Sequence, residues 1–368
     1  MEVLMEQAKV YFTNFETTME ENIQQKFSRL LLTAGLDQID FENKYVAIKL
    51  HFGEPGNLAY LRPQYARTLV DLVKQLGGKP FLTDCNTLYV GGRTNGLDHL
   101  ESAYQNGFNP YNMGCHVLIG DGLRGTDEVE VPVNGDYVHN ARIGRAVMDA
   151  DIVISLAHFK GHEGAGFGGT IKNVGMGCGS RAGKEEMHAS RKPKVRTEEC
   201  IGCGSCAKNC AHGAPVVEGG KMQIDLRKCL GCGRCIGVCP TQAIYCEEDA
   251  SSTVLNSKMA EYTKAVVQGR PAFYINIICD VSPYCDCYGV NHPAIIPDIG
   301  MLASFDPVAI DEASGRLCNQ APRSANVTFE GNTEDIFTDL HPSTNWHVQI
   351  SHGKKIGLGT DEYRLIEI

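Results

Sequence analysis

The chain is 368 residues long, 43% hydrophobic and 21% charged, which is typical of a globular protein with two domains or one domain carrying an insertion. Its formal net charge of −10 argues against a nucleic-acid partner, because phosphate binding requires a basic surface. No apolar run approaches the roughly 18 residues of a membrane-spanning helix, and the residues after Met1 show no export signal. We therefore expect a cytoplasmic protein without a membrane partner, whose 16 cysteines serve metal rather than disulfides.

Strand-like and helix-like stretches alternate along the first half of the chain. Strands are predicted over Lys9–Thr13, Tyr45–Leu50, Lys79–Thr83, Cys115–Gly120, Glu128–Val133 and Asp151–Leu156, and helices over Met19–Thr33, Pro63–Gly77, Gly96–Asn106 and His139–Asp149. This alternation predicts an α/β fold with a mostly parallel sheet and helices on both faces. Such sheets bind ligands beyond the carboxyl ends of their strands, here at His51–Asn57, Asp84–Arg93 and the residues after Leu156.

The stretch after Leu156 is rich in glycine, with about two residues in five from Gly161 to Gly183. A glycine-rich loop lets backbone amides approach an anion, and neighbouring cations add charge. A flexible lid or a packing loop is the alternative, because neither a Rossmann nor a P-loop fingerprint is present. The predicted anion-binding residues are Lys49, Lys160, Lys172, Asn173 and Arg181.

Eight cysteines between Glu199 and Tyr245 repeat the spacing Cys-x2-Cys-x2-Cys-x3-Cys twice. Three closely spaced thiolates wrap one iron–sulfur cube while the fourth ligates the other cube, so the spacing predicts two [4Fe–4S] clusters. The predicted ligands are Cys200, Cys203, Cys206 and Cys239 for one cluster, and Cys229, Cys232, Cys235 and Cys210 for the second. Two zinc sites are the nearest alternative, although zinc sites usually pair distant Cys-x2-Cys motifs. The stretch resembles bacterial-type two-cluster ferredoxins, with Ala211 after Cys210 where Pro240 follows Cys239.

The same alternation resumes after the cysteine repeats. It predicts a helix over Leu255–Val267, strands over Pro271–Cys279 and Ile299–Ser304, a helix capped by Asp306 with Pro307 first, and a helix and strand within Trp346–Ile368. The simplest organisation is one α/β domain formed by residues 1–190 and 249–368, with a ferredoxin-like 2[4Fe–4S] insert over 191–248. Two separate flanking domains are the alternative.

Three histidines are predicted catalytic residues. His51, with Glu54, follows a strand and suits general acid–base chemistry. His158 and His162 are four residues apart, a spacing found in metal-binding pairs. Three interpretations remain open for them: metal ligation, acid–base catalysis or anion binding, and no chemical role.

Some cysteines outside the repeats also need an interpretation. Cys285-Asp286-Cys287, with His292 nearby, places two sulfurs on one side of an extended chain, which fits a further metal or a structural role. Cys178 lies in a Gly-rich run and could approach a substrate, but a single cysteine is more often buried and inert. The remaining cysteines are predicted to pack as small hydrophobic residues: Cys85, Cys115, Cys246, Cys279 and Cys318.

Five segments across the chain together carry a wider resemblance: Ala47–Asn57, His158–His162, Gly168–Asn173, Ile296–Gly300 and Asp306–Asp311. They resemble the landmark segments of the uncharacterised Fe–S-centre proteins of the domain-of-unknown-function family 362. The resemblance implies an α/β scaffold with a ferredoxin-like insert and no established reaction.

The leading functional prediction is an iron–sulfur oxidoreductase that relays low-potential electrons. The electrons pass between a redox partner or donor and an anionic small molecule or flavin-like cofactor in the α/β domain. Charges nearly balance from Arg196 to Asp249, which favours an internal relay over a freely docking carrier. A redox-sensing or assembly protein, and a non-redox enzyme with structural clusters, are the alternatives.

Overall fold

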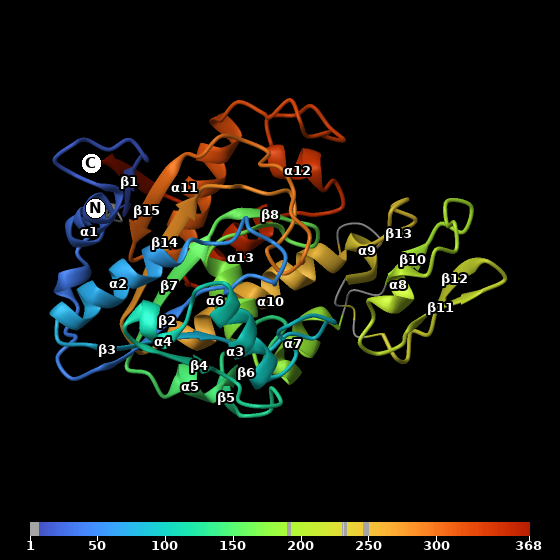
Figure 1. Cartoon of the computed structure of the whole chain (residues 1–368), viewed down its shortest axis with the longest axis horizontal. Helices are drawn as coiled ribbons and strands as arrows, with labels where there is room; N and C mark the ends of the chain where they lie inside the picture. Colours follow the sequence, from blue (N-terminus) through green and yellow to red (C-terminus); the bar gives the residue numbers. More distant parts are fainter. Residues whose placement is uncertain (1–6, 190–192, 230, 232–233, 246–249) are drawn as a thin grey trace, which may run out of the picture.

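The computed structural model describes residues 7–189, 193–229, 231, 234–245 and 250–368. It consists of a body built on one eight-stranded sheet and a smaller segment, residues 194–245, that projects from one side of it (Figure 1). In order across the sheet the strands are β16 (Tyr363–Glu367), β1 (Ala8–Thr13), β15 (Gly300–Ser304), β14 (Ala272–Ile278), β7 (Ile152–His158), β2 (Tyr45–Lys49), β3 (Lys79–Asp84) and β4 (His116–Ile119).

The sheet is mostly parallel. Only β15 runs antiparallel to its two neighbours, β1 and β14. The predicted α/β class with a mostly parallel sheet is therefore confirmed. The parallel pairs β14–β7 and β1–β16 join strands from before and after residues 194–245, so both flanks of that segment build one sheet.

Helices cover both faces of this sheet (Figure 1). Residues of β14 alternate between two apolar cores, with Phe273 and Ile275 in one and Tyr274 and Ile278 in the other, as the two-residue period of a strand requires. The first core is covered by α1 (Ile23–Thr33), α2 (Pro63–Gln75), α3 (Gly96–Gln105) and α4 (Pro110–Met113), with the short 3-10 turn η1 (Leu36–Gln38). The second is covered by α5 (Arg145–Met148), α6 (Thr170–Cys178), α7 (Arg181–His188), α10 (Ala250–Val267), α11 (Pro307–Gln320), α12 (Ile336–Leu340) and α13 (His347–Lys355).

The helix predicted over His139–Asp149 is wrong. The structure has a strand there, β6 (Asn140–Gly144), paired antiparallel with β5 (Glu128–Pro132) and followed by the single turn α5. Ala141 and Ile143 are buried while Asn140 and Arg142 are exposed, which is the alternation of a half-buried strand. This two-residue pattern is short enough to be read as part of a helix.

The glycine-rich stretch is not a loop. It forms a hairpin, β8 (Lys160–His162) with β9 (Gly166–Gly168), and then the helices α6 and α7. A side chain at Gly175 would collide with the backbone of Met259 in α10. The glycines of α6 thus serve close helix packing, which outweighs their low helix propensity.

Segment 194–245 has little apolar core of its own. Its described elements are β10 (Lys194–Val195), α8 (Ser205–Lys208), β11 (Pro215–Glu218), β12 (Lys221–Ile224), α9 (Arg234–Gly237) and β13 (Ile244–Tyr245). β10 pairs with β13, and β11 with β12. Among its described residues, one apolar cluster is buried, formed by Cys200, Cys206, Met222, Ala243 and Ile244.

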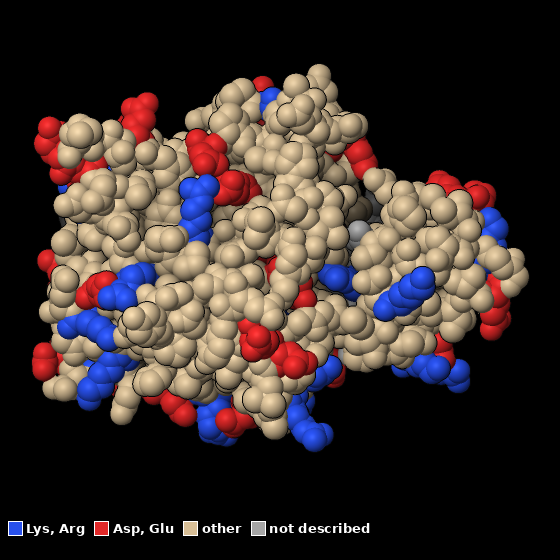
Figure 2. Space-filling view, viewed as in Figure 1, with Lys and Arg blue, Asp and Glu red and all other residues tan. Residues whose placement is uncertain are grey.

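The surface carries charges of both signs, as the composition predicts. Lys and Arg are interspersed with Asp and Glu over the face shown in Figure 2. Across the described part of the chain, we find no helix both long and apolar enough to cross a bilayer.

Candidate functional site

A cavity lies where β2, β3 and β7 end, at the edge of the sheet where parallel strands commonly bind ligands. Its empty space, including the open mouth, is about 970 Å³. Seven of the eight residues predicted for catalysis or anion binding line it: Lys49, His51, His158, Lys160, His162, Lys172 and Asn173. Arg181 does not, and its guanidinium instead donates to the carbonyl oxygen of Thr94 at 3.2 Å.

Lys49 ends β2 and is buried in the cavity wall. Its Nζ lies 3.0 Å from Asp84 Oδ1 and 3.0 Å from Asn173 Oδ1. Burial raises the pKa of Asp84, but the charges of Lys49 and other cations outweigh it, so this pKa lies below its usual value. Lys49 and Asp84 therefore form a charge-balanced pair that fixes this wall.

Arg93 holds His51 in place. The guanidinium donates to Glu54 Oε2, to His51 Nε2 and to the Tyr89 hydroxyl, each at 2.8 Å. Burial, followed by the charges of Arg93 and Lys160, holds the pKa of His51 well below its usual range. The imidazole of His51 is therefore neutral near pH 7. Its Nδ1 also accepts from the backbone N–H of Gly53 at 3.0 Å, so both ring nitrogens are bonded within the protein and His51 supports the cavity wall.

His158 and Lys160 both bind Asp286. His158 Nδ1 lies 2.8 Å from Asp286 Oδ2, and Lys160 Nζ lies 3.2 Å from the same oxygen. Burial raises the pKa of Asp286, but its contacts with His158 and Lys160 outweigh burial and lower this pKa to about 2. His158 Nε2 lies 2.7 Å from the Cys279 carbonyl oxygen. Since both ring nitrogens face acceptors, His158 positions Asp286 rather than exchanging protons with a guest.

His162 forms the turn between β8 and β9. Its Nδ1 accepts from the backbone N–H groups of Gly164 and Ala165 at 3.0 and 3.1 Å. Its Nε2 lies 3.8 Å from Glu163 Oε1, which also accepts from the Tyr288 hydroxyl at 2.7 Å. His158 lies closer to a carboxylate, but its second ring nitrogen faces the Cys279 carbonyl oxygen, so His162 beside Glu163 is the better candidate for general acid–base chemistry.

Three further cations give the cavity a positive surplus. Lys172, in the first turn of α6, places Nζ 3.3 Å from the Cys285 sulfur. Lys184 and Arg234 donate to backbone carbonyl oxygens. Within the described ranges, no carboxylate lies within 4 Å of any of these three cationic groups. Glu163 also lines the cavity and offsets part of this charge, but the lining stays net positive, which matches an anionic guest.

Asp311 occupies the N-terminus of α6. Its two carboxylate oxygens accept from the backbone N–H groups of Thr170 and Ile171 at 2.7 and 2.8 Å. Burial is the main cause that raises the pKa of Asp311 to about 6. The amides that the sequence suggested for an anion are thus already bonded, and recognition of a guest falls to the side chains.

Four cysteines of segment 194–245 line one hollow: Cys200, Cys203, Cys206 and Cys239. They are the set predicted to hold one cluster, and four converging thiols match the donors that a [4Fe–4S] cube requires. The backbone N–H of Met222 donates to Cys200 Sγ at 3.4 Å. Such bonds to sulfur adjust the potential of a bound cluster.

The second predicted set is described in part. Cys210, Cys229 and Cys235 belong to the described residues, and the backbone N–H of Ala214 donates to Cys210 Sγ at 3.4 Å. Cys232 lies outside the described residues, as does Cys246.

Arg234 connects segment 194–245 to the cavity. Its guanidinium lies over the ring of Tyr288, 4.3 Å from the centroid, and 5.3 Å from that of Tyr89. Its Nη1 donates to the Cys287 carbonyl oxygen at 3.3 Å. Val238 packs against the same buried residues. The second cysteine repeat therefore contributes to the cavity wall.

The family model described as "Domain of unknown function (DUF362)" matches residues 46–316. The chain belongs to this family. The match contains the whole lining of the cavity and all of segment 194–245. Membership of DUF362, predicted from the landmark segments, is confirmed, while the iron–sulfur centres remain a prediction.

Other similarities of this DUF362 chain are more distant. A thylakoid-associated protein of Synechocystis sp. is 29% identical over 124 residues, 34% of this chain and 35% of that protein. The lactate racemase apoprotein from Thermoanaerobacterium thermosaccharolyticum matches with a TM-score of 0.40 and 12% identity over 74% of this chain and 51% of that one. A Thermotoga maritima protein matches with a TM-score of 0.43 and 11% identity over 83% and 59%. The chain thus spans about a third of the curated relative.

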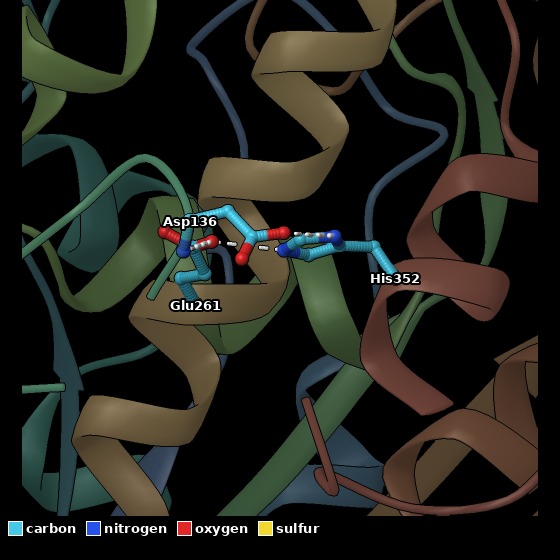
Figure 3. Close-up of side chains that lie close together, drawn as sticks. All are labelled: Asp136, Glu261 and His352. Carbon is cyan, nitrogen blue, oxygen red and sulfur yellow. Dashed lines mark hydrogen bonds and ion pairs between the residues drawn. The ribbon is translucent and has the colours of Figure 1, made fainter. Parts of the chain in front are cut away.

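A separate group of potential metal ligands, Asp136, Glu261 and His352, lies away from the cavity (Figure 3). Glu261 accepts from His352 Nε2 at 2.9 Å and from the backbone N–H groups of residues 136–138. Lys355 pairs with Asp136 at 2.5 Å. These contacts give the group a structural explanation, in which a buried carboxylate anchors a turn.

Several site residues were missed by sequence reasoning. Glu163 lines the cavity, and Asp286 binds two predicted site residues from behind. Asp84 and Arg93 also line it, and both belong to the stretch predicted to bind ligands, although neither was singled out as a site residue. Lys184, a cation that flanks the glycine-rich stretch, lines it as well. The positions of Glu163 and Asp286 depend on tertiary contacts.

Proposed function

We propose that this DUF362 protein carries two [4Fe–4S] clusters and relays low-potential electrons to or from an anionic small molecule bound in the cavity of the body. The observation that carries the proposal is the position of Arg234. This residue belongs to the cysteine-repeat segment and also lines the cavity that collects the predicted anion-binding and catalytic residues. This contact supports the proposal, because the proposed electron source and the proposed guest site would then be neighbours.

The cysteine chemistry supports the first half of the proposal. Cys200, Cys203, Cys206 and Cys239 surround one hollow, and Cys210, Cys229, Cys232 and Cys235 would hold the second cluster. When bound, such clusters supply one-electron transfer at low potential. The protein contributes position, exclusion of water and N–H donors to sulfur.

The cavity residues divide into supports and groups that meet the guest. Lys49 and Lys160 are paired with carboxylates, so they maintain the wall more than they attract charge. Lys172, Lys184 and Arg234 supply the attraction for an anion. Neutral His51 is bonded to Arg93 and Gly53 and would support the wall, and His162 beside Glu163 would move a proton.

A cycling experiment tests this proposal. Protein isolated without oxygen is reduced with dithionite and reoxidised with benzyl viologen while its visible absorbance is followed. We expect bleaching and recovery through several cycles, with about half the amplitude in Cys239→Ser and full amplitude in Cys318→Ser, whose cysteine is buried in α11. Iron-loaded protein whose absorbance does not respond to dithionite would contradict the relay.

One observation favours a second function, a non-redox enzyme with structural clusters. The small core of segment 194–245 suggests that metal is needed to hold its fold. The same cycling experiment separates the two functions, since structural clusters would stay oxidised throughout.

A further inference from the structure

Three cysteines that belong to neither repeat line the cavity, Cys85, Cys285 and Cys287, and the last two lie two residues apart in the chain. Cys285 and Cys287 follow β14, are both buried and both line the cavity. Between them, the carboxylate of Asp286 is held by His158 and Lys160. This anchored residue fixes the local backbone, so the two thiols are presented together from a rigid turn.

The two sulfurs interact with each other and with a cation. The side chains of Cys285 and Cys287 are hydrogen-bonded, and Lys172 Nζ lies 3.3 Å from Cys285 Sγ. The bond from Cys287, with the charges of Lys172 and Lys160, outweighs burial and lowers the pKa of Cys285 to about 5. Burial and the neighbouring Cys285 raise the pKa of Cys287 well above its usual value. One thiolate beside one protonated thiol is the form in which a dithiol undergoes exchange.

Other buried cysteines of the body provide a contrast. Burial raises the pKa of Cys178 and of Cys115 to about 11 and that of Cys279 to about 12. These thiols behave as small packing residues, in agreement with the sequence interpretation. The bond between the side chains of Cys285 and Cys287 distinguishes this pair from Cys178, Cys115 and Cys279.

The dithiol also touches the cysteine-repeat segment. Arg234 donates to the Cys287 carbonyl oxygen, and Val238 packs in the same apolar group as both sulfurs. Each of these residues immediately precedes a predicted cluster ligand, Cys235 and Cys239 respectively. His292, considered as a third metal ligand, instead packs its ring on Tyr284 at 4.9 Å and does not line the cavity.

We propose that Cys285 and Cys287 form a redox-active dithiol that holds two electrons between the cluster-binding segment and the cavity. On oxidation a bond forms between the two Sγ atoms, the S–H bond of Cys287 breaks, and its proton leaves to solvent. The two electrons go singly to the two [4Fe–4S] centres of the proposed function, on which this electron partner rests. Reduction returns two electrons and one proton.

Differential alkylation tests the dithiol without needing cluster activity. Oxygen-free holoprotein is treated with stoichiometric diamide, alkylated with iodoacetamide and mapped by mass spectrometry. We expect the peptide with Cys285 and Cys287 to resist alkylation and to be about 2 Da lighter, and to take two labels after reduction. Alkylation of both thiols after diamide treatment would overturn the proposal. It would also be overturned if both thiols were protected without the mass loss of about 2 Da and the protein held an additional metal ion that is absent from Cys285→Ser.

Electron counting tests the connection to the clusters. Diamide-treated holoprotein is titrated with reduced methyl viologen. Wild type and the control Cys318→Ser should take up about two more electrons per chain than Cys285→Ser or Cys287→Ser, with equal cluster bleaching in all four. Equal electron counts would overturn the dithiol store. Loss of cluster bleaching in every protein would overturn the proposed function instead. The peptide masses would still show whether Cys285 and Cys287 form a disulfide.

Discussion

The body and segment 194–245 differ in what holds them together. The body has two extensive apolar cores, and its site is fixed by buried polar networks such as Lys49 with Asp84 and His158 with Asp286. The segment has one small core that includes two of its own predicted cluster ligands, Cys200 and Cys206. A body of this kind is stable without a cofactor, whereas a segment so small requires crosslinks.

This difference explains how the work is divided between the two regions. The body supplies most of the wall of a positively charged cavity. The segment supplies the predicted electron carriers and reaches the cavity through Arg234. The predictions below test this division.

Removing iron should have the largest effect. After anaerobic chelation, we expect protease cleavage throughout residues 194–245, because the remaining core is too small to stay folded. The body should stay intact, since its cores contain none of the predicted ligands. Limited proteolysis with mass mapping measures both effects. Equal protection of the segment with and without iron would contradict a structural dependence on metal.

Removing the carboxylate of Asp311 should destabilise the body. Asp311→Ala leaves the N–H groups of Thr170 and Ile171 without their acceptor inside the core, at a cost of about 2–4 kcal/mol in the free energy of unfolding. Urea denaturation measures it. The matched control is Arg316→Gln on the same helix, whose exposed guanidinium pairs with Glu312 and should contribute less than about 1 kcal/mol. Comparable losses in both variants would show that the α6 terminus is not held by Asp311.

Neutralising Lys172 should weaken anion binding. Lys172→Gln removes a cavity cation that has no carboxylate partner among the described residues, and we expect about 10-fold weaker binding of inorganic phosphate by calorimetry. Arg181→Gln is the matched control. Arg181 was predicted from sequence but lies outside the cavity lining, so its replacement should leave binding unchanged. If only Arg181→Gln weakened binding, the cavity would not be the anion site.

The smallest expected effect is a shift in the pH dependence of Cys285. Its folded pKa of about 5 lies below the usual thiol value of 9.0, so the thiolate dominates above about pH 5. In reduced protein, the rate of alkylation at Cys285 should rise through pH 5 and then level off. Lys172→Gln should move this midpoint upward, because it removes a cation beside the sulfur. A midpoint near 9 in wild type would contradict the thiolate.

Much of the fold was predictable because local patterns agree with tertiary structure. Asp306 and Pro307 begin α11 as predicted, with Asp306 Oδ1 accepting from Val308 and Ala309 N–H groups at 2.9 Å. The strand at Ile152–His158 is continuously apolar because it is buried on both faces. In these segments the amino-acid pattern alone was enough to predict the structure.

The errors arose where tertiary packing decides the structure. Gly175 and Gly177 suggested a loop, but they allow α6 to approach α10 and leave room for Lys49. The strand β6 forms because β5 pairs with it, a contact that local periodicity does not contain. Sequence reasoning placed Arg181 with Lys172 because they are near in the chain, whereas the turn from α6 to α7 separates them.

The candidate site was predictable in composition but not in roles. The strand-end rule identified His51, His158 and Lys172, which meet in one cavity. Whether a side chain attracts a guest or supports the cavity wall depends on its partners, which can be distant in sequence. His158, for example, is bonded to Asp286. Those partners become visible only in three dimensions.

The most direct measurement is an inventory of metal and sulfide in protein purified without oxygen. If paired cubes bring electrons to the cavity, each chain should contain about eight iron atoms and about eight acid-labile sulfides, falling to about half in Cys239→Ser. Zinc bound without sulfide would contradict the account at its base.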